Sequence, residues 1–123
     1  MIVGIGIDII EVDRIKKAIE TYGEKFLKRV FTDTEINYCE EFKEKKFLHY
    51  AVRFAAKEAF SKAIGTGLTQ GFKLNQVGIV NERNGKPKIE LYESMYEKWG
   101  MNQIHISLSH IDNIASAVVV IES

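Results

Sequence analysis

The sequence predicts an α+β fold in a single domain, residues 1–123, in which a mostly antiparallel sheet is wrapped around a long alanine-rich helix. Three observations lead to this prediction. Apolar and polar residues alternate, as in strands, at residues 2–8 and 104–110, and the run at 115–122 can pair with the second of these. The strongest helical pattern, residues 47–64, lies between these strands. Two further β-like runs flank Asn84-Gly85, a dipeptide typical of hairpins. Helices collected between such strands favour α+β over alternating β/α units.

Local signals support the helices of the first half. Residues 11–22 carry one apolar stripe, and Gly23 is the expected end of that helix. The sequence "TDTE" is a capping box, because Thr32 can accept from the backbone while Glu35, three residues later, reaches back. We therefore expect a second helix over residues 33–42.

Turn residues divide the second half. "GTG" at 65–67 ends the long helix. Pro87 is tolerable at the start of the second hairpin strand. A short helix is expected at 91–99, and the last two strands can pair across the turn "IDN".

Composition limits the class of protein. The chain has 17 basic and 17 acidic residues, and zero net charge argues against bulk capture of nucleic acid. No apolar run approaches the roughly 18 residues that span a membrane, and the N-terminus lacks the order of a signal peptide. The single cysteine, Cys39, cannot form an internal disulfide and is interpreted as structural. We expect a cytoplasmic protein without a nucleic-acid or membrane partner.

Basic residues are concentrated between Arg14 and Arg29, where six of them accompany two acidic residues, Glu20 and Glu24. A basic surface on a neutral protein indicates a defined acidic partner. A solvated helix face is the alternative, and both interpretations stay open on this cluster alone.

The segment "GIGIDIIEVDR", which begins at Gly4, sets two glycines and a carboxylate on one face of a strand. Val3, Ile5 and Ile7 share the other face and are expected to fill the core. Glycine weakens a strand, so a tight helix–sheet contact, a strand bend or an approaching ligand is needed to explain it. A dinucleotide fingerprint and a Walker A loop are both excluded, because the third glycine and the Lys-Ser/Thr pair are absent.

The long helix has two contrasting halves when it is projected at about 100° per residue. One half is mostly alanine, which allows very close packing. The other half is polar and holds Arg53, Lys57, Glu58, Ser61 and Lys62, with Phe54 as an apolar exception that is expected to face a ligand or a neighbouring subunit. Like charges at positions 53 and 57 weaken an isolated helix. An anion lying along this half would explain them, and a Glu58–Lys62 surface pair is the alternative.

Two carboxylates that meet over an anion suggest a further role, the binding of Mg²⁺. Magnesium usually takes one or two carboxylate ligands and completes its shell with water and phosphate. Asp8, at the end of the first strand, and Glu58 are expected to supply the two carboxylates. On this interpretation Gly4 and Gly6 keep space clear for the metal or the phosphates. On the strand "IHISLSH", a phosphate contact from His105 competes with a simply solvated sheet face.

The segments "GIGIDIIEVDRI" and "RFAAKEAFSKAIGTG", with "ISLSH" near the C-terminus, resemble the holo-[acyl-carrier-protein] synthases. These form the short, bacterial-type branch of the 4′-phosphopantetheinyl transferase family, and the resemblance covers residues 2–121. It implies transfer of the 4′-phosphopantetheine arm of coenzyme A to a serine of apo-acyl carrier protein, with adenosine 3′,5′-bisphosphate as the other product. It also implies a magnesium cofactor, a homotrimer with sites between subunits, and a place in fatty acid biosynthesis.

The resemblance also implies roles for single residues. Asp8 and Glu58 match the Mg²⁺ ligands, and Lys62 matches the lysine beside the coenzyme A pyrophosphate. Arg14 and the following helix, with Lys17 and Lys25, match the surface that meets the acidic carrier protein. The positions near coenzyme A are Arg53, Phe54, Ser61, Lys62, Gly65, Thr66, Gly67, Pro87 and His105, to which the polar half of the helix adds Lys57.

These residues lead to a mechanistic hypothesis. The carrier-protein serine attacks the phosphorus that bears the pantetheine arm, Glu58 accepts the serine proton, and Lys62 stabilises the leaving phosphate. Asp8 is chiefly a metal ligand. A non-catalytic coenzyme A or nucleotide-binding module is a rival that does not need Asp8 opposite Glu58. A small RNA-binding domain is a second rival, disfavoured by the zero net charge.

Overall fold

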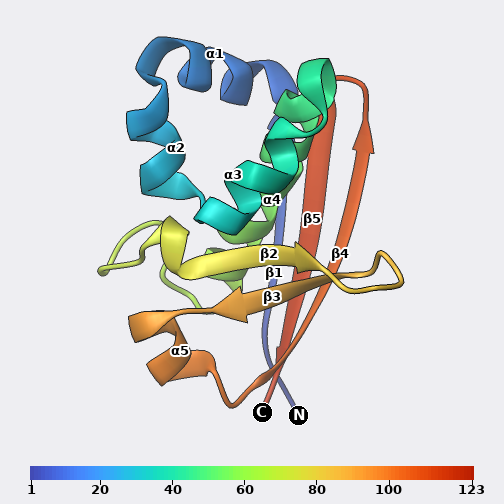
Figure 1. Ribbon diagram of the computed structural model, residues 1–123. Coiled ribbons are helices and arrows are strands. Elements are labelled where there is room, and N and C mark those ends of the chain that lie inside the picture. Colours follow the sequence, from blue (N-terminus) through green and yellow to red (C-terminus); the bar gives the residue numbers. More distant parts are fainter.

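The computed structural model describes residues 1–123 and has two antiparallel sheets with the long helix packed between them (Figure 1). In chain order the elements are β1 (Ile2–Glu11), α1 (Val12–Tyr22), α2 (Glu24–Val30), α3 (Asp33–Glu40), α4 (Lys46–Ala63), β2 (Val77–Asn81), β3 (Pro87–Leu91), α5 (Glu93–Trp99), β4 (Gln103–Ile111) and β5 (Ile114–Glu122). Short 3₁₀ turns, Lys43–Lys45 and Leu74–Gln76, precede α4 and β2. None of the helices has the length and apolarity needed to cross a bilayer.

The larger sheet joins the two ends of the chain. Its strand order is β1-β5-β4 with antiparallel pairs, so the termini lie side by side at the foot of Figure 1. The smaller sheet is the β2–β3 hairpin, which confirms the turn predicted at Asn84-Gly85. Gly85 has φ +86°, and the Asn84 side chain accepts a hydrogen bond from the backbone of Lys86. Pro87 is the first residue of β3, where it removes no ladder bond from the strand interior.

The alanine half of α4 packs on the inner face of the larger sheet at very short range. A Cβ atom on Gly4 would lie 2.0 Å from the carbonyl oxygen of Ala63, and one on Gly6 would lie 1.9 Å from that of Ala59. Only glycine fits, because the helix backbone occupies the space that a side chain would take. The prediction that these glycines leave room for a metal or phosphates is therefore wrong. The tight helix–sheet contact, the other interpretation, is confirmed.

The opposite face of β1 is also not as expected. Val3, Ile5 and Ile7 were predicted to fill the core, but they are 48%, 61% and 66% exposed. The alternation is right and its assignment to faces is wrong, since the close helix contact requires glycine on the inner face. The core of this half of the molecule is built by α4, β2, β5 and Met95 of α5, through Ala55, Ala56, Ala59, Phe60, Ala63, Val77, Ile79, Met95, Ala117, Val119 and Ile121.

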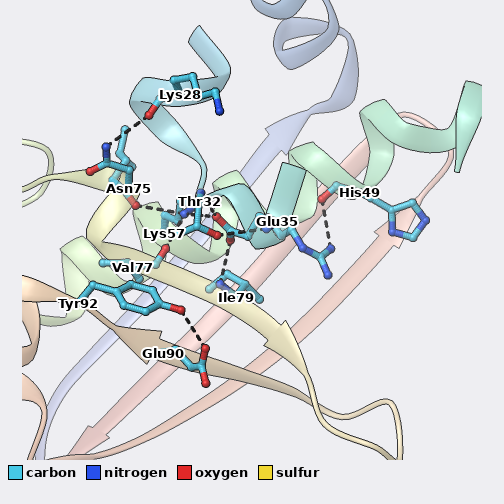
Figure 2. A network of polar contacts seen from close by, with 12 residues as sticks. Lys28, Thr32, Glu35, His49, Lys57, Asn75, Val77, Ile79, Glu90 and Tyr92 are labelled. Atoms are coloured by element: carbon cyan, nitrogen blue, oxygen red, sulfur yellow. Dashed lines mark hydrogen bonds and ion pairs between the residues drawn. The ribbon is translucent and has the colours of Figure 1, made fainter. Parts of the chain in front are cut away.

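A buried ion pair ties α4 to α3 and β2, and we call it the Lys57–Glu35 pair (Figure 2). The Lys57 ammonium group is 2.7 Å from Glu35 Oε1, and both side chains are fully buried. Glu35 also accepts hydrogen bonds from the backbone N–H groups of Thr32 and Ile79. The bond from Thr32 belongs to the predicted capping box, both halves of which are present.

Sequence reasoning identified most elements but missed α2. Gly23 does end α1, as predicted, and has φ +59° there. The seven-residue α2 begins directly after it and is too short for its periodicity to be recognised. The other errors are of boundaries: β1 continues to Glu11 instead of residue 8, α3 ends at Glu40 instead of 42, and α5 begins at Glu93 instead of 91.

Candidate active site

Three of the predicted catalytic side chains meet at one edge of α4. Asp8 follows the glycines on the inner face of β1, and Glu58 and Lys62 lie one helical turn apart. Lys62 Nζ donates to Asp8 Oδ1 and to the carbonyl oxygen of Ile7, each at 3.0 Å. The structure therefore brings Asp8, Glu58 and Lys62 together, as the sequence predicts.

The two carboxyl groups act on each other. Asp8 is 8% exposed, and Glu58 is half-buried. Burial raises the pKa of Glu58, and the neighbouring carboxylate of Asp8 raises it further. The charges of Lys62 and Arg14 lower it. Arg14, exposed on α1, is thus close enough to influence this site.

One oxygen of this pair has no partner. Asp8 Oδ2 is buried and makes no hydrogen bond, which is unusual for a native carboxylate. No group of three or more His, Cys, Asp or Glu side chains is arranged to hold a metal ion. Two carboxylates instead suit a hard cation that completes its shell with water and phosphate oxygens. The unpartnered oxygen and the raised pKa of Glu58 are both features that a bound divalent cation relieves.

A cavity of about 420 Å³ lies between α4, the β2–β3 hairpin and β4. Two predicted coenzyme contacts, Arg53 and Pro87, line it, and Lys86 adds a second cation. His49 also lines it, but burial and the charge of Arg53 lower the pKa of its imidazole. Neither carboxylate of the Asp8–Glu58 pair lines this cavity. Its basic walls are suited to an anion.

Arg53 is held firmly at the wall of this cavity. It is 4% exposed, its guanidinium carbon lies 4.4 Å from the ring centre of Tyr38, and it donates to Asn81 Oδ1 at 2.9 Å. Its Nε is buried and has no hydrogen-bond partner. One donor of a fixed cation therefore remains free for an acceptor.

Lys57 is the clearest departure from the sequence prediction. Its three N–H donors have three acceptors, namely Glu35 and the backbone carbonyls of Leu74 and Val77. It is fully buried, so the prediction that it binds the coenzyme is wrong. The polar half of α4 is divided into a buried row and a more exposed row, because α3 supplies a buried counter-charge that the helix alone does not reveal. The buried row is Arg53, Lys57 and Ser61; Phe54, Glu58 and Lys62 form the more exposed row.

The remaining predicted contacts lie along α4 and its C-terminal turn. The buried Ser61 hydroxyl donates to the carbonyl of Glu58 at 2.6 Å, and Phe54 is half-buried against core residues. Gly65 and Gly67 have φ of +86° and +58°, so the turn requires their freedom. Cys39 is buried, and burial raises the pKa of its thiol to about 12, in keeping with a structural role.

Within a single chain, His105 belongs neither to the Asp8–Glu58–Lys62 group nor to the lining of the cavity beside Arg53. It lies on the outer face of the larger sheet, opposite Val120, whereas Asp8 is on the inner face opposite Ala117. Its Nε2 is 2.6 Å from Glu122 Oε1. The structure therefore does not bring His105 to the carboxylate pair.

The predicted partner surface is exposed on α1 and α2. Arg14, Lys17 and Lys25 are all exposed, and Lys17 forms an ion pair with Asp13 at 3.2 Å. Between the two helices is a groove of about 460 Å³ lined by Tyr22, Lys25, Phe26 and Arg29. Basic side chains thus border an apolar floor.

Sequence reasoning missed the partners of the buried cations. Glu35 was identified only as a capping residue, and Tyr38 and Asn81, which hold Arg53, were not identified at all. A pairing between residues 35 and 57 cannot be deduced from a local pattern.

Comparisons with known proteins agree with this geometry. The profile of the 4′-phosphopantetheinyl transferase superfamily matches residues 4–119. A holo-[acyl-carrier-protein] synthase of Solibacter usitatus is 47% identical over 126 residues, with 100% of each chain covered. The crystal structure of a holo-(acyl-carrier-protein) synthase from Bacillus anthracis in complex with CoA (3′,5′-ADP) has a TM-score of 0.85 and 40% identity, covering 100% of this chain and 98% of that one. The Helicobacter pylori synthase in complex with coenzyme A has a TM-score of 0.82 and 32% identity, covering 96% and 99%.

Proposed function

Because this chain belongs to the 4′-phosphopantetheinyl transferase superfamily, we propose that it transfers the 4′-phosphopantetheine arm of coenzyme A to a serine of apo-acyl carrier protein. The second product is adenosine 3′,5′-bisphosphate. Relatives that match over the whole chain are holo-[acyl-carrier-protein] synthases, and two solved ones hold coenzyme A or its nucleotide part. The protein acts on a cytoplasmic carrier protein of fatty acid biosynthesis.

The observation that carries this proposal is the unpartnered Asp8 Oδ2 beside the half-buried Glu58. These two side chains would hold Mg²⁺, with coenzyme A phosphate and water as further ligands. Bound there, the ion supplies charge neutralisation at the pyrophosphate. A binding module without chemistry has no need of two carboxylates at the same place.

The side chains around the carboxylate pair divide the work of the transfer. The serine oxygen forms a bond to the phosphorus of the pantetheine arm, and the bond from that phosphorus to the leaving nucleotide breaks. Glu58, whose raised pKa shows a preference for the protonated state, accepts the serine proton. Lys62, which is half-exposed, stabilises the charge that develops on the leaving phosphate.

The cavity lined by Arg53 and Pro87 is the proposed site for the nucleotide end of coenzyme A. The free Nε of Arg53 and the neighbouring Lys86 offer donors to a phosphate. Gly65, Thr66 and Gly67 lie at the end of α4, one turn beyond Lys62, and line the path of the coenzyme in this proposal.

The acidic carrier protein docks on the basic surface of α1 and α2. Arg14, Lys17 and Lys25 provide the charge, and the adjoining groove provides apolar contact area. The charge of Arg14 lowers the pKa of Glu58, which supports a docking surface close to the reacting groups. The carrier serine can therefore reach the site while its helix stays on the surface.

We propose a homotrimer as the working assembly. The outer face of the larger sheet exposes Val3, Ile5, Ile7 and Ile9 of β1, which is an apolar stripe that a lone soluble subunit rarely presents. His105 lies on this same face, so burial against a neighbouring subunit would carry it toward a site that its own subunit does not complete. Sedimentation equilibrium gives the subunit number directly.

The proposed activity is tested with purified protein, coenzyme A and apo-acyl carrier protein, with and without Mg²⁺. Mass spectrometry of the carrier protein reports the gain of one phosphopantetheine group. The proposal expects this gain with Mg²⁺ and its loss when the metal is chelated. No gain with any apo-carrier protein, although coenzyme A binds, would favour the non-catalytic binding module.

A further inference from the structure

The contacts of Lys57, which is fully buried on α4, suggest a structural role for its charge. Lys57 uses every donor internally, so it has none to offer a ligand. Its partner Glu35 is equally occupied, with acceptor bonds from Thr32 and Ile79 (Figure 2). The pair therefore attaches one point of α4 to α3, to the turn before β2 and to β2 itself.

The side of α4 that faces β1 has no buried ion pair, and its hydrogen bonds to that strand come from the half-exposed Lys62. There the helix lies on Gly4 and Gly6 through Ala59 and Ala63, with backbone against backbone. Such a contact fixes how near the helix lies to the sheet. It has no interlocking side chains to fix the rotation of the helix about its own axis, because glycine offers no knob and alanine only a methyl group.

Rotation matters because the neighbour of Lys57 is Glu58. Side-chain tips lie roughly 6 Å from a helix axis, so a turn of about 20° moves them by about 2 Å. A displacement of about 1 Å at reacting groups can lower a rate by about 100-fold. The approach of Glu58 to Asp8 thus depends on a rotation that the alanine–glycine contact leaves free.

We propose that the Lys57–Glu35 pair is a positioning device for the transfer reaction, which fixes the rotation of α4 so that Glu58 lies against Asp8. This inference rests on the proposed function. Stability alone is a poor reason for the pair, because replacing a buried ion pair by neutral side chains of similar size is often harmless to folding. Setting the register between elements is the best-attested use of such pairs.

The test uses the double variant E35Q/K57M, which removes both charges at nearly constant volume. Glutamine retains one acceptor oxygen, which can serve one of the two backbone N–H groups that Glu35 binds on separate oxygens. We expect a folded protein with a lower melting temperature than the wild type, a kcat at least about tenfold lower, and KM values for coenzyme A and carrier protein within about threefold. The second readout is the affinity for Mn²⁺ in the presence of coenzyme A, measured by electron paramagnetic resonance, and we expect it to fall about tenfold.

The matched control is E40Q/K46M. This variant removes the other ion pair between α3 and α4, which lies at the start of α4 with an N–O distance of 3.2 Å. It is expected to keep wild-type kcat and Mn²⁺ affinity. If E35Q/K57M fails to fold, E35D is used instead. This variant keeps the negative charge but moves it away from Lys57 by one methylene group. We expect smaller losses of kcat and of Mn²⁺ affinity than in the double variant.

A folded E35Q/K57M or E35D with kcat and Mn²⁺ affinity within twofold of wild type overturns the positioning role. Equal losses in the control overturn it as well. Failure of the proposed function looks different: the wild-type chain itself then modifies no carrier protein, while the Mn²⁺ measurement still tests whether the pair orders residues 8 and 58.

Discussion

Two lysine–carboxylate pairs lie five residues apart on α4, and their surroundings are opposite. The Lys57–Glu35 pair is completely buried, and every donor and acceptor in it is used. The Lys62–Asp8 pair has a half-exposed lysine and a carboxylate with one oxygen left without a partner. Their ion-pair distances are similar, 2.7 and 3.0 Å, so distance does not distinguish them.

The two pairs differ in whether all their hydrogen-bond donors and acceptors have partners within the protein. A pair whose polar groups are all satisfied inside the protein holds elements together and has nothing to offer a ligand. A pair with an unpartnered oxygen and a half-exposed lysine can still bind a substrate or a cation. The same comparison separates Arg53, which keeps a free Nε, from Lys57 in the same buried row.

The largest effect is expected on folding, from the single variant K57M. It leaves the buried Glu35 carboxylate without its counter-charge, which typically costs about 3–5 kcal/mol. Urea denaturation should show this loss of unfolding free energy. A loss below about 1 kcal/mol would mean that water reaches the Glu35 carboxylate. The surroundings of the Lys57–Glu35 and Lys62–Asp8 pairs would then be less different than the structure indicates.

The next effect is on catalysis, from D8N. Removing a cation ligand should lower the transfer rate by at least about 100-fold, equivalent to about 2.7 kcal/mol of barrier. Stability should be unchanged or slightly higher, because the amide no longer buries a charged oxygen without a partner. The control is E11Q, an exposed glutamate on the same strand, for which rate and stability should both stay at wild-type values.

A smaller loss is expected for K62M. Its lysine is half-exposed, so the ion pair contributes at most about 1 kcal/mol to stability after solvent screening. Transfer should fall about tenfold, through kcat rather than the KM for carrier protein. An unchanged kcat would remove Lys62 from the reaction and leave it as a surface partner of Asp8.

The smallest effect is the pH dependence that Glu58 gives to stability. Its pKa is raised above the ordinary 4.5 by burial and by Asp8, so the native protein holds this proton where the unfolded chain has released it. Stability from this group is therefore lost as the pH rises from 4.5 through the raised pKa. In chelator, the unfolding free energy of E58Q relative to wild type should increase over that window. A flat difference would mean that Glu58 is effectively solvated.

Much of this arrangement could be predicted from local sequence. Alternation, the capping box and Asn84-Gly85 identified strands, a helix start and the hairpin, because each depends on neighbours along the chain. Asp8 and Glu58 were expected to meet because one lies at the end of a strand and the other on the polar half of the long helix, and the role of Lys62 followed from the resemblance to the family. The match to relatives over the whole chain shows the family that these segments suggested.

The errors concern contacts between distant segments. Ile5 was expected inside because the two glycines of β1 are compatible with a close helix, a strand bend or a ligand, and only the packing shows that the backbone of α4 lies against them. Lys57 was placed on the surface because its counter-charge comes from a helix 22 residues earlier. A polar half-helix is compatible with solvent, ligand or a buried partner, and only the packing decides among them.

We expect the divalent cation to bind beside the Lys62–Asp8 pair, where one carboxylate oxygen has no partner, and not at the Lys57–Glu35 pair. The most direct measurement is a crystal structure with coenzyme A and Mn²⁺, in which anomalous scattering locates the metal. We expect a peak about 2.2 Å from Asp8 Oδ2, close also to Glu58 and to a phosphate oxygen. A peak remote from both carboxylates, with coenzyme A bound, would contradict it.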